Sequence, residues 1–202
     1  MRFRHLASFR RTEPRDVVRQ AGGLWFVDVL EHIDERLRGA APNVRATFAV
    51  WCAEQALTVS CEALPEVHAA REYWRSALAQ VWDALQSTRD HPIGDLAAAV
   101  DRVNQGGSGP EWDALDEDGV AACIYAVRSF LSSDPTAPRW AAQRAVDAAF
   151  TVDVQSRHFG DLAEEALRPP VQQLLRAMDG TLDLLVATGA PPDVVSQLRG
   201  SR

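Results

Sequence analysis

The residues best suited to chemistry lie in one short acidic segment, 111–118. It reads Glu-Trp-Asp-Ala-Leu-Asp-Glu-Asp, so five of its eight residues are acids and one is a tryptophan. The candidate partner-binding residues are Trp112, Asp113, Asp116, Glu117 and Asp118. Carboxylates at the start of a helix are stabilised by the helix dipole and by unpaired N–H groups. The same carboxylates could bind a divalent cation or form a docking face for a basic protein.

The spacing of the other chemical groups does not favour a metal site. The alternating acids and twelfth-position glutamate of a calcium loop are absent from the acidic segment. The five histidines lie in separate segments, without an H-E-x-x-H motif or a Glu-x-x-His pair. His68 and Glu72 are four residues apart, which is more typical of a solvated pair on a helix surface. The sequence therefore predicts no bound metal and no cofactor.

Nucleophilic and phosphate-binding motifs are also missing. The glycine-rich stretch 104–110 has proline where a nucleophile elbow needs glycine, and no strand pattern precedes it. All 21 basic residues are arginine, which excludes a lysine-bearing phosphate loop and Schiff-base catalysis. We expect residues 104–118 to form an exposed, mobile loop that ends in the acidic face.

Charge is unevenly distributed along the chain, whose net charge is −7. Residues 1–23 hold six arginines and two acids, whereas the rest holds 15 arginines and 26 acids. An acidic body disfavours nucleic acid as a partner, because phosphate contacts need a basic face. We expect residues 1–23 to be a basic arm that folds back on the acidic body or stays mobile.

The localisation expected is cytoplasmic. No apolar run approaches the roughly 20 residues that span a bilayer, so no membrane partner is expected. The first 25 residues lack the apolar stretch of a secretory signal. The three cysteines form no C-x-x-C pair, which indicates reduced thiols in a reducing compartment.

Apolar residues recur at helical spacing through most of the chain, and no stretch alternates as a strand would. The pattern predicts helices over 24–38, 44–63, 66–86, 92–103, 120–131, 136–154, 159–168 and 171–187, with Asn43 as a plausible N-cap of the second. The prediction is thus an all-α, single-domain bundle of about eight helices with no sheet. Its domain is 24–189, followed by a frayed tail at 190–202.

The core is expected to contain the large apolar residues of these stripes. They are Phe48, Trp51, Trp74, Leu78, Trp82, Ile124, Val127 and Phe150. The helix over 136–154 is expected to bury mainly alanine and to lie centrally, because small residues let two helix backbones approach closely.

Three stretches occur in an order similar to that of a known family. They are Phe26–Glu54 with its leucine stripe and arginine-bearing helix, the L-x-x-x-W-x-x-L pattern over 78–85, and the acidic turn with Gly-Val over 116–126. In these features the chain resembles the YjaG-like family of small all-helical bacterial domains of unknown function. Tyr125 departs from the family, which tends to have an acid there, and the basic arm has no counterpart. The resemblance implies a compact helical bundle and no activity.

Two classes of function stay open on this basis. One is a non-enzymatic interaction protein of immunity or regulatory type, whose acidic face binds a partner that could be basic. The alternative is a metal-assisted or acid–base enzyme that uses the cluster at 111–118 or His68. No nucleophile with its base and no convergent acid–base pair can be assembled from the sequence, which favours the interaction protein.

Overall fold

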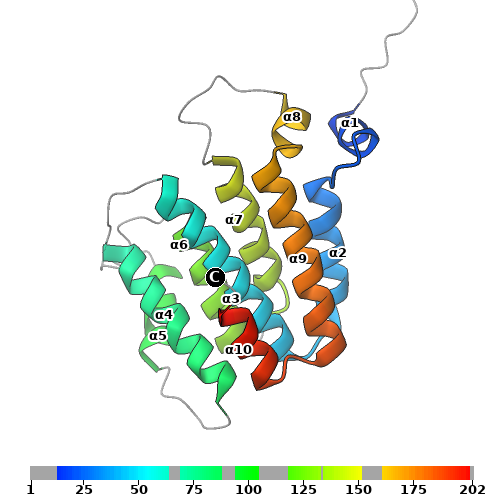
Figure 1. Cartoon of the computed structure of the whole chain (residues 1–202). Coiled ribbons are helices and arrows are strands. Elements are labelled where there is room, and N and C mark those ends of the chain that lie inside the picture. The colour runs from blue at the N-terminus through cyan, green and yellow to red at the C-terminus, as the bar shows by residue number, and fades with distance from the viewer. Residues whose placement is uncertain are drawn as a thin grey trace, which may run out of the picture.

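The computed structural model describes residues 13–63, 69–87, 94–104, 118–132, 134–151 and 161–200. Throughout these residues the regular elements are helices, and the described part of the chain contains no strand, which confirms the all-α prediction (Figure 1). The helices are α1 (Pro14–Gln20), α2 (Phe26–Arg38), α3 (Pro42–Ala63), α4 (Ala69–Gln86), α5 (Gly94–Asn104), α6 (Asp118–Ser132), α7 (Ala137–Thr151), α8 (Leu162–Ala166), α9 (Pro169–Thr188) and α10 (Pro192–Gly200). The eight predicted helices correspond to α2 through α9.

The C-terminal residues are not a frayed tail, and that expectation is wrong for 192–200. They form α10, which packs against α4 and buries Val194, Val195 and Leu198. Arg199 adds an ion pair to α4, with its Nη1 2.5 Å from Oδ1 of Asp83. Three apolar residues on one side of a nine-residue helix are enough to hold it against a larger core.

The other additional helix, α1, lies in the segment expected to be a basic arm, of which the structure describes residues 13–23. Val18 of α1 is fully buried in a small second cluster with α8. Arg15 and Arg19 both pair with the carboxylate of Asp28 on α2, at 2.6 and 2.7 Å. This part of the basic segment therefore contacts an acidic residue of the body.

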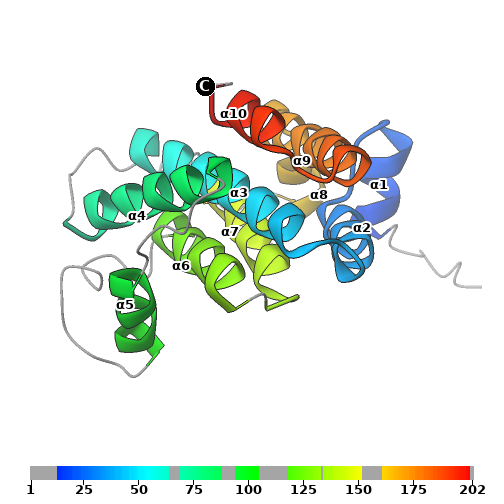
Figure 2. The same cartoon turned by 90° about the horizontal axis from the view of Figure 1, so that it is seen from below.

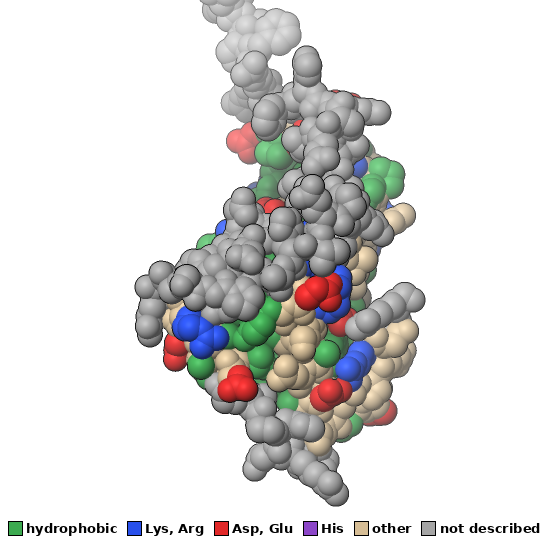
Figure 3. Space-filling model, turned by 90° about the vertical axis from the view of Figure 1, so that its left-hand side faces the viewer, with side chains coloured by type: hydrophobic (Ala, Val, Ile, Leu, Met, Phe, Trp, Pro, Cys, Tyr) green, Lys and Arg blue, Asp and Glu red, His purple; other side chains and the backbone are tan. Residues whose placement is uncertain are grey.

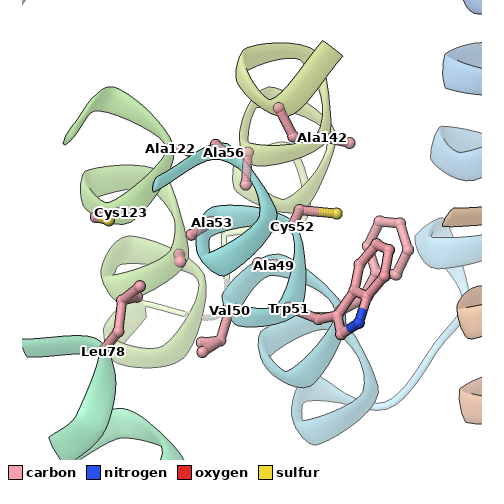
Figure 4. Close-up of a cluster of buried hydrophobic side chains, with 14 of the residues drawn as sticks. Ala49, Val50, Trp51, Cys52, Ala53, Ala56, Leu78, Ala122, Cys123 and Ala142 are labelled. Carbon is pink, nitrogen blue, oxygen red and sulfur yellow. The ribbon is translucent and has the colours of Figure 1, made fainter. Parts of the chain in front are cut away.

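Helix α3 occupies the centre of the bundle, with α6 and α7 as its main neighbours (Figures 1 and 2). It carries buried residues on every side, as a helix surrounded by others must. Figure 4 shows small side chains between the three helices: Ala49, Ala53 and Ala56 of α3, Ala122 of α6 and Ala142 of α7. The predicted alanine face of α7 is buried as expected, so these backbones approach closely.

Seven of the eight predicted core residues are buried: Phe48, Trp51, Trp74, Leu78, Trp82, Ile124 and Val127. Phe150 is only partly buried, because it lies where the main core meets the small cluster of α1 and α8. There it packs edge to face against Phe26, with ring centroids 5.5 Å apart.

Asn43 does not cap α3, so that prediction is wrong. Helix α3 begins one residue earlier, at Pro42, where the missing N–H of proline costs nothing. The Nδ2 of Asn43 instead donates to the carbonyl oxygens of Gly189 (2.8 Å) and Ala190 (3.4 Å). Asn43 thereby ties the start of α3 to the turn that follows α9.

Candidate functional site

Of the predicted partner-binding residues, the structure describes only Asp118. Outside the described residues lie Trp112, Asp113, Asp116 and Glu117, together with His68 and most of the expected loop 104–118. Asn104 is the last residue of α5 rather than part of that loop. The contact and enzyme hypotheses for the acidic segment therefore stay predictions.

Asp118 is the first residue of α6, a position at which the helix dipole stabilises a negatively charged carboxylate. Its Oδ1 accepts a hydrogen bond from Nη1 of Arg144 on α7, at 3.0 Å. The same guanidinium lies 3.7 Å from Asp147. With 19% of its side chain exposed, Asp118 acts as a link between α6 and α7.

The side chains that could bind a metal do not converge within the described part of the chain. Within the described ranges, no three His, Cys, Asp or Glu residues come together as a metal site. Glu72, four residues after His68 in the sequence, pairs with Arg75. Cys52 and Cys123 are both buried, and burial raises the pKa of the Cys52 thiol well above its ordinary value.

The structure does assemble a surface group that the sequence did not single out. Tyr125 of α6 stacks on Trp140 of α7, with ring centroids 6.1 Å apart and planes inclined by 26°. The guanidinium carbon of Arg128 lies 5.8 Å from the Tyr125 ring centroid, and that of Arg139 lies 5.3 Å from the Trp140 ring. We call these four residues the aromatic–arginine surface. Trp140 is 40% exposed, unlike the buried tryptophans Trp51, Trp74 and Trp82.

The turn between α6 and α7 holds this surface in place through Asp134. Its Oδ1 accepts hydrogen bonds from the backbone N–H and the hydroxyl of Thr136, at 2.9 and 2.8 Å. Its Oδ2 lies 3.6 Å from Arg128. Burial alone would raise the pKa of Asp134, but these hydrogen bonds and the Arg128 charge outweigh burial and lower it. The ionised carboxylate therefore fixes the start of α7 and the position of Arg128 together.

A groove of about 400 Å³ lies beside the aromatic–arginine surface, between α2 and the start of α7. The two helices are neighbours, as Figure 2 shows. The groove is lined by Glu31, Asp34 and Arg38 of α2 and by Thr136, Arg139 and Trp140. Arg38 donates from Nη2 to Oδ2 of Asp34 at 3.0 Å, a pairing within one helix. The lining of the groove thus includes two carboxylates and an exposed indole.

Sequence reasoning missed this site because its two halves come from helices whose pairing the sequence does not show. Tyr125 and Arg128 are three residues apart on one helix face, and Arg139 precedes Trp140. That spacing was a usable signal only once α6 and α7 were known to be antiparallel neighbours.

Elsewhere some charged side chains form local ion pairs. Figure 3 views the molecule from the side of α4 and α6, and on its described part some acidic side chains adjoin an arginine, whereas others do not. The ion pairs of Glu72 with Arg75 and of Asp118 with Arg144 illustrate this pattern. No helix in the described ranges has the length and apolar character needed to cross a membrane.

Neither a family model, nor a curated protein, nor a solved structure matches this chain. The resemblance to the YjaG-like family therefore stays a prediction. The aromatic–arginine surface and the groove beside it form the candidate site within the described part of the chain.

Proposed function

We propose that the chain is a non-enzymatic helical module, of immunity or regulatory type, that binds a basic protein partner. The observation that supports this proposal is the exposed Trp140, held on Tyr125 and flanked by two arginines. Tryptophan, tyrosine and arginine are the residues that most often dominate the binding energy of protein interfaces. A tryptophan serving only the fold would bury more of its indole.

The basic character of the partner follows from charge. The chain carries a net charge of −7, and its acids are concentrated outside residues 1–23. An acidic surface accelerates association with a basic protein through long-range attraction. The acidic segment 111–118 is the second proposed contact, with Trp112, Asp113, Asp116, Glu117 and Asp118 as its contact residues. The whole module is proposed to be a single cytoplasmic domain.

Site-specific crosslinking in the native cells tests the proposal. A photoreactive amino acid replaces Thr136, which is exposed in the groove, or Glu164, which is exposed on α8 at the other end of α7. We expect the Thr136 variant to capture a defined protein that the Glu164 variant does not capture. Mass spectrometry then identifies that protein, and the purified pair is used to measure binding.

The purified pair supplies the decisive comparison. Trp140→Ala should weaken the affinity by at least about tenfold, since interface tryptophans contribute about 2 kcal/mol or more. Trp140→Phe keeps an aromatic ring in place and should weaken it less. If both positions capture the same proteins, or Trp140→Ala leaves the affinity unchanged, the proposed function is wrong.

A further inference from the structure

We propose that the groove between α2 and α7 receives an arginine side chain of the partner, with its guanidinium between the Glu31 carboxylate and the Trp140 indole. The proposal rests on the proposed function and names the chemistry of the side chain that the groove takes. Three observations carry it: the acidic side chains of α2, the exposed indole, and the arginines of this chain that already line the groove.

Helix α2 carries three acids at a spacing of three residues, Asp28, Glu31 and Asp34, which places them along one side of the helix. Asp28 forms ion pairs with two arginines of α1, Arg15 and Arg19. Asp34 forms an ion pair with Arg38. Two of the three acids therefore already accept guanidinium groups.

Glu31 lies between these two occupied carboxylates and differs from both. It is exposed, it lines the groove, and it has no hydrogen bond or ion pair within the described part of the chain. A carboxylate accepts a guanidinium through two parallel hydrogen bonds, an arrangement that lysine cannot reproduce. Glu31 is thus the acid lining the groove to which a guanidinium from another protein can be added.

Trp140 supplies the opposite wall. Indole is the best ring for binding a cation over its face, and a planar guanidinium also stacks on it. Arg139 already lies 5.3 Å from the centroid of this ring, so the position tolerates a guanidinium. Tyr125 stacks on the same ring. An incoming guanidinium would therefore use the part of the indole that remains exposed, since 40% of the residue is accessible.

The two arginines of the groove allow an experiment to distinguish a cationic occupant from an anionic one. Arg38 and Arg139 would attract an anion, whereas Glu31 and Asp34 would repel it. Arg38 and Arg139 would compete with an incoming arginine for the carboxylates and the indole of the groove. Arg38 is weakly held in its ion pair with Asp34, because 73% of the Arg38 side chain is exposed. The two occupants therefore predict opposite effects of removing Arg38.

The test titrates a hexa-arginine peptide into the purified full chain at low ionic strength and measures affinity by calorimetry. Glu31→Gln and Trp140→Ala should each weaken binding about five- to tenfold, whereas Arg38→Gln should tighten it. The matched control Glu164→Gln changes net charge equally but lies on α8, and it should weaken binding less than about twofold. Hexa-lysine should bind more weakly than hexa-arginine.

The indole N–H signal of Trp140, assigned by comparison with Trp140→Phe, provides a local readout by NMR. It should move on addition of hexa-arginine in the native chain, and in Glu31→Gln it should need about five- to tenfold more peptide to move as far. Circular dichroism confirms that each variant folds, and Trp140→Phe replaces Trp140→Ala if the latter does not. Weaker binding in Arg38→Gln, or equal weakening by Glu31→Gln and Glu164→Gln, overturns the proposal.

Failure of this proposal is distinguishable from failure of the proposed function. If crosslinking at Thr136 captures a specific partner that binds Glu31→Gln as tightly as the native chain, the arginine proposal is wrong and the interaction function stands. If crosslinking captures no specific partner, the proposed function is wrong whatever the peptide does.

Discussion

A β-carbon placed on Gly119 of α6 would lie 3.1 Å from the Cα of Leu57 on α3. It would also lie 2.8 Å from Oγ of Ser60, one turn further along α3. The two helix backbones are therefore almost in contact at this point. The buried alanines Ala53, Ala56 and Ala122 continue the close approach along the same helix pair. Other residues could adopt the helical backbone conformation of Gly119. Glycine is therefore required here by the close packing against α3 and not by the backbone conformation.

The first prediction follows from this contact. Gly119→Ala should lower the free energy of unfolding by about 1–3 kcal/mol, because α6 has to move away from α3. Gly180→Ala on α9 is the matched control, since a β-carbon there meets open space. It should raise stability by up to about 1 kcal/mol through better helix propensity. Urea denaturation followed by circular dichroism measures both, and a neutral Gly119→Ala would contradict the packing argument.

The second prediction concerns Gln172, a buried polar residue of α9. Its Oε1 accepts from the N–H of Leu24 (2.8 Å), and its Nε2 donates to the carbonyls of Leu24 (2.8 Å) and Ala166 (2.7 Å). Gln172→Leu leaves these backbone groups without partners and should cost about 1–3 kcal/mol. Gln173→Leu, at the exposed neighbouring position, should change stability by less than about 0.5 kcal/mol. Equal denaturation midpoints for the two variants would show that the three bonds contribute little.

The sequence was sufficient for the features that depend on local periodicity. The stripes of α2 through α9 and their large apolar residues could be predicted, since a helix must bury one face. The roles of Gln172 and Asn43 could not, because their partners lie 148 and 146 residues away. Helix α10 was missed for a related reason: its three apolar residues stabilise a helix only when α4 is there to cover them.

In the candidate site, too, the contacts within one helix were predictable and the contacts between helices were not. The pairing of Asp34 with Arg38 was predictable, since it lies within one helix. The stack of Tyr125 on Trp140 joins two helices, and the groove adds a third. Such a site depends on the rotation of each helix about its axis, which apolar periodicity fixes only coarsely.

The third prediction is a pH dependence at Asp134. The folded protein lowers the pKa of this carboxyl, so its ionised form adds stability that is fully present above the unfolded pKa. That stability is lost as the pH falls through the folded pKa. Asp134→Asn keeps the hydrogen-bond acceptor but removes the charge, and it should be less stable than the native chain at pH 7. The difference should shrink in urea denaturation below about pH 4, and a constant difference would contradict the argument.

The fourth prediction concerns thiol reactivity. Burial raises the pKa of Cys52, so almost no thiolate forms at neutral pH and no reagent reaches it. Iodoacetamide should leave Cys52 unmodified in the folded protein and label it fully in urea, as read by mass spectrometry of its peptide. Cys123 is also fully buried and serves as an internal comparison. Labelling of Cys52 at the same rate with and without urea would show that α3 opens readily.

The last prediction separates the contact role of the acidic segment from its structural role. Asp118 pairs with Arg144, so its replacement disturbs the junction of α6 and α7 as well as the charge. Asp118→Ser alone should lower stability by up to about 1 kcal/mol. It should slow association less than the double substitution does, because it removes one charge and not two. Replacing both Asp116 and Glu117 with serine should leave stability unchanged and slow association with the basic partner several-fold at low salt, with a smaller effect at high salt. Stopped-flow kinetics measures the rate, and an association rate that the double substitution does not change would leave helix stabilisation as the only role of these acids.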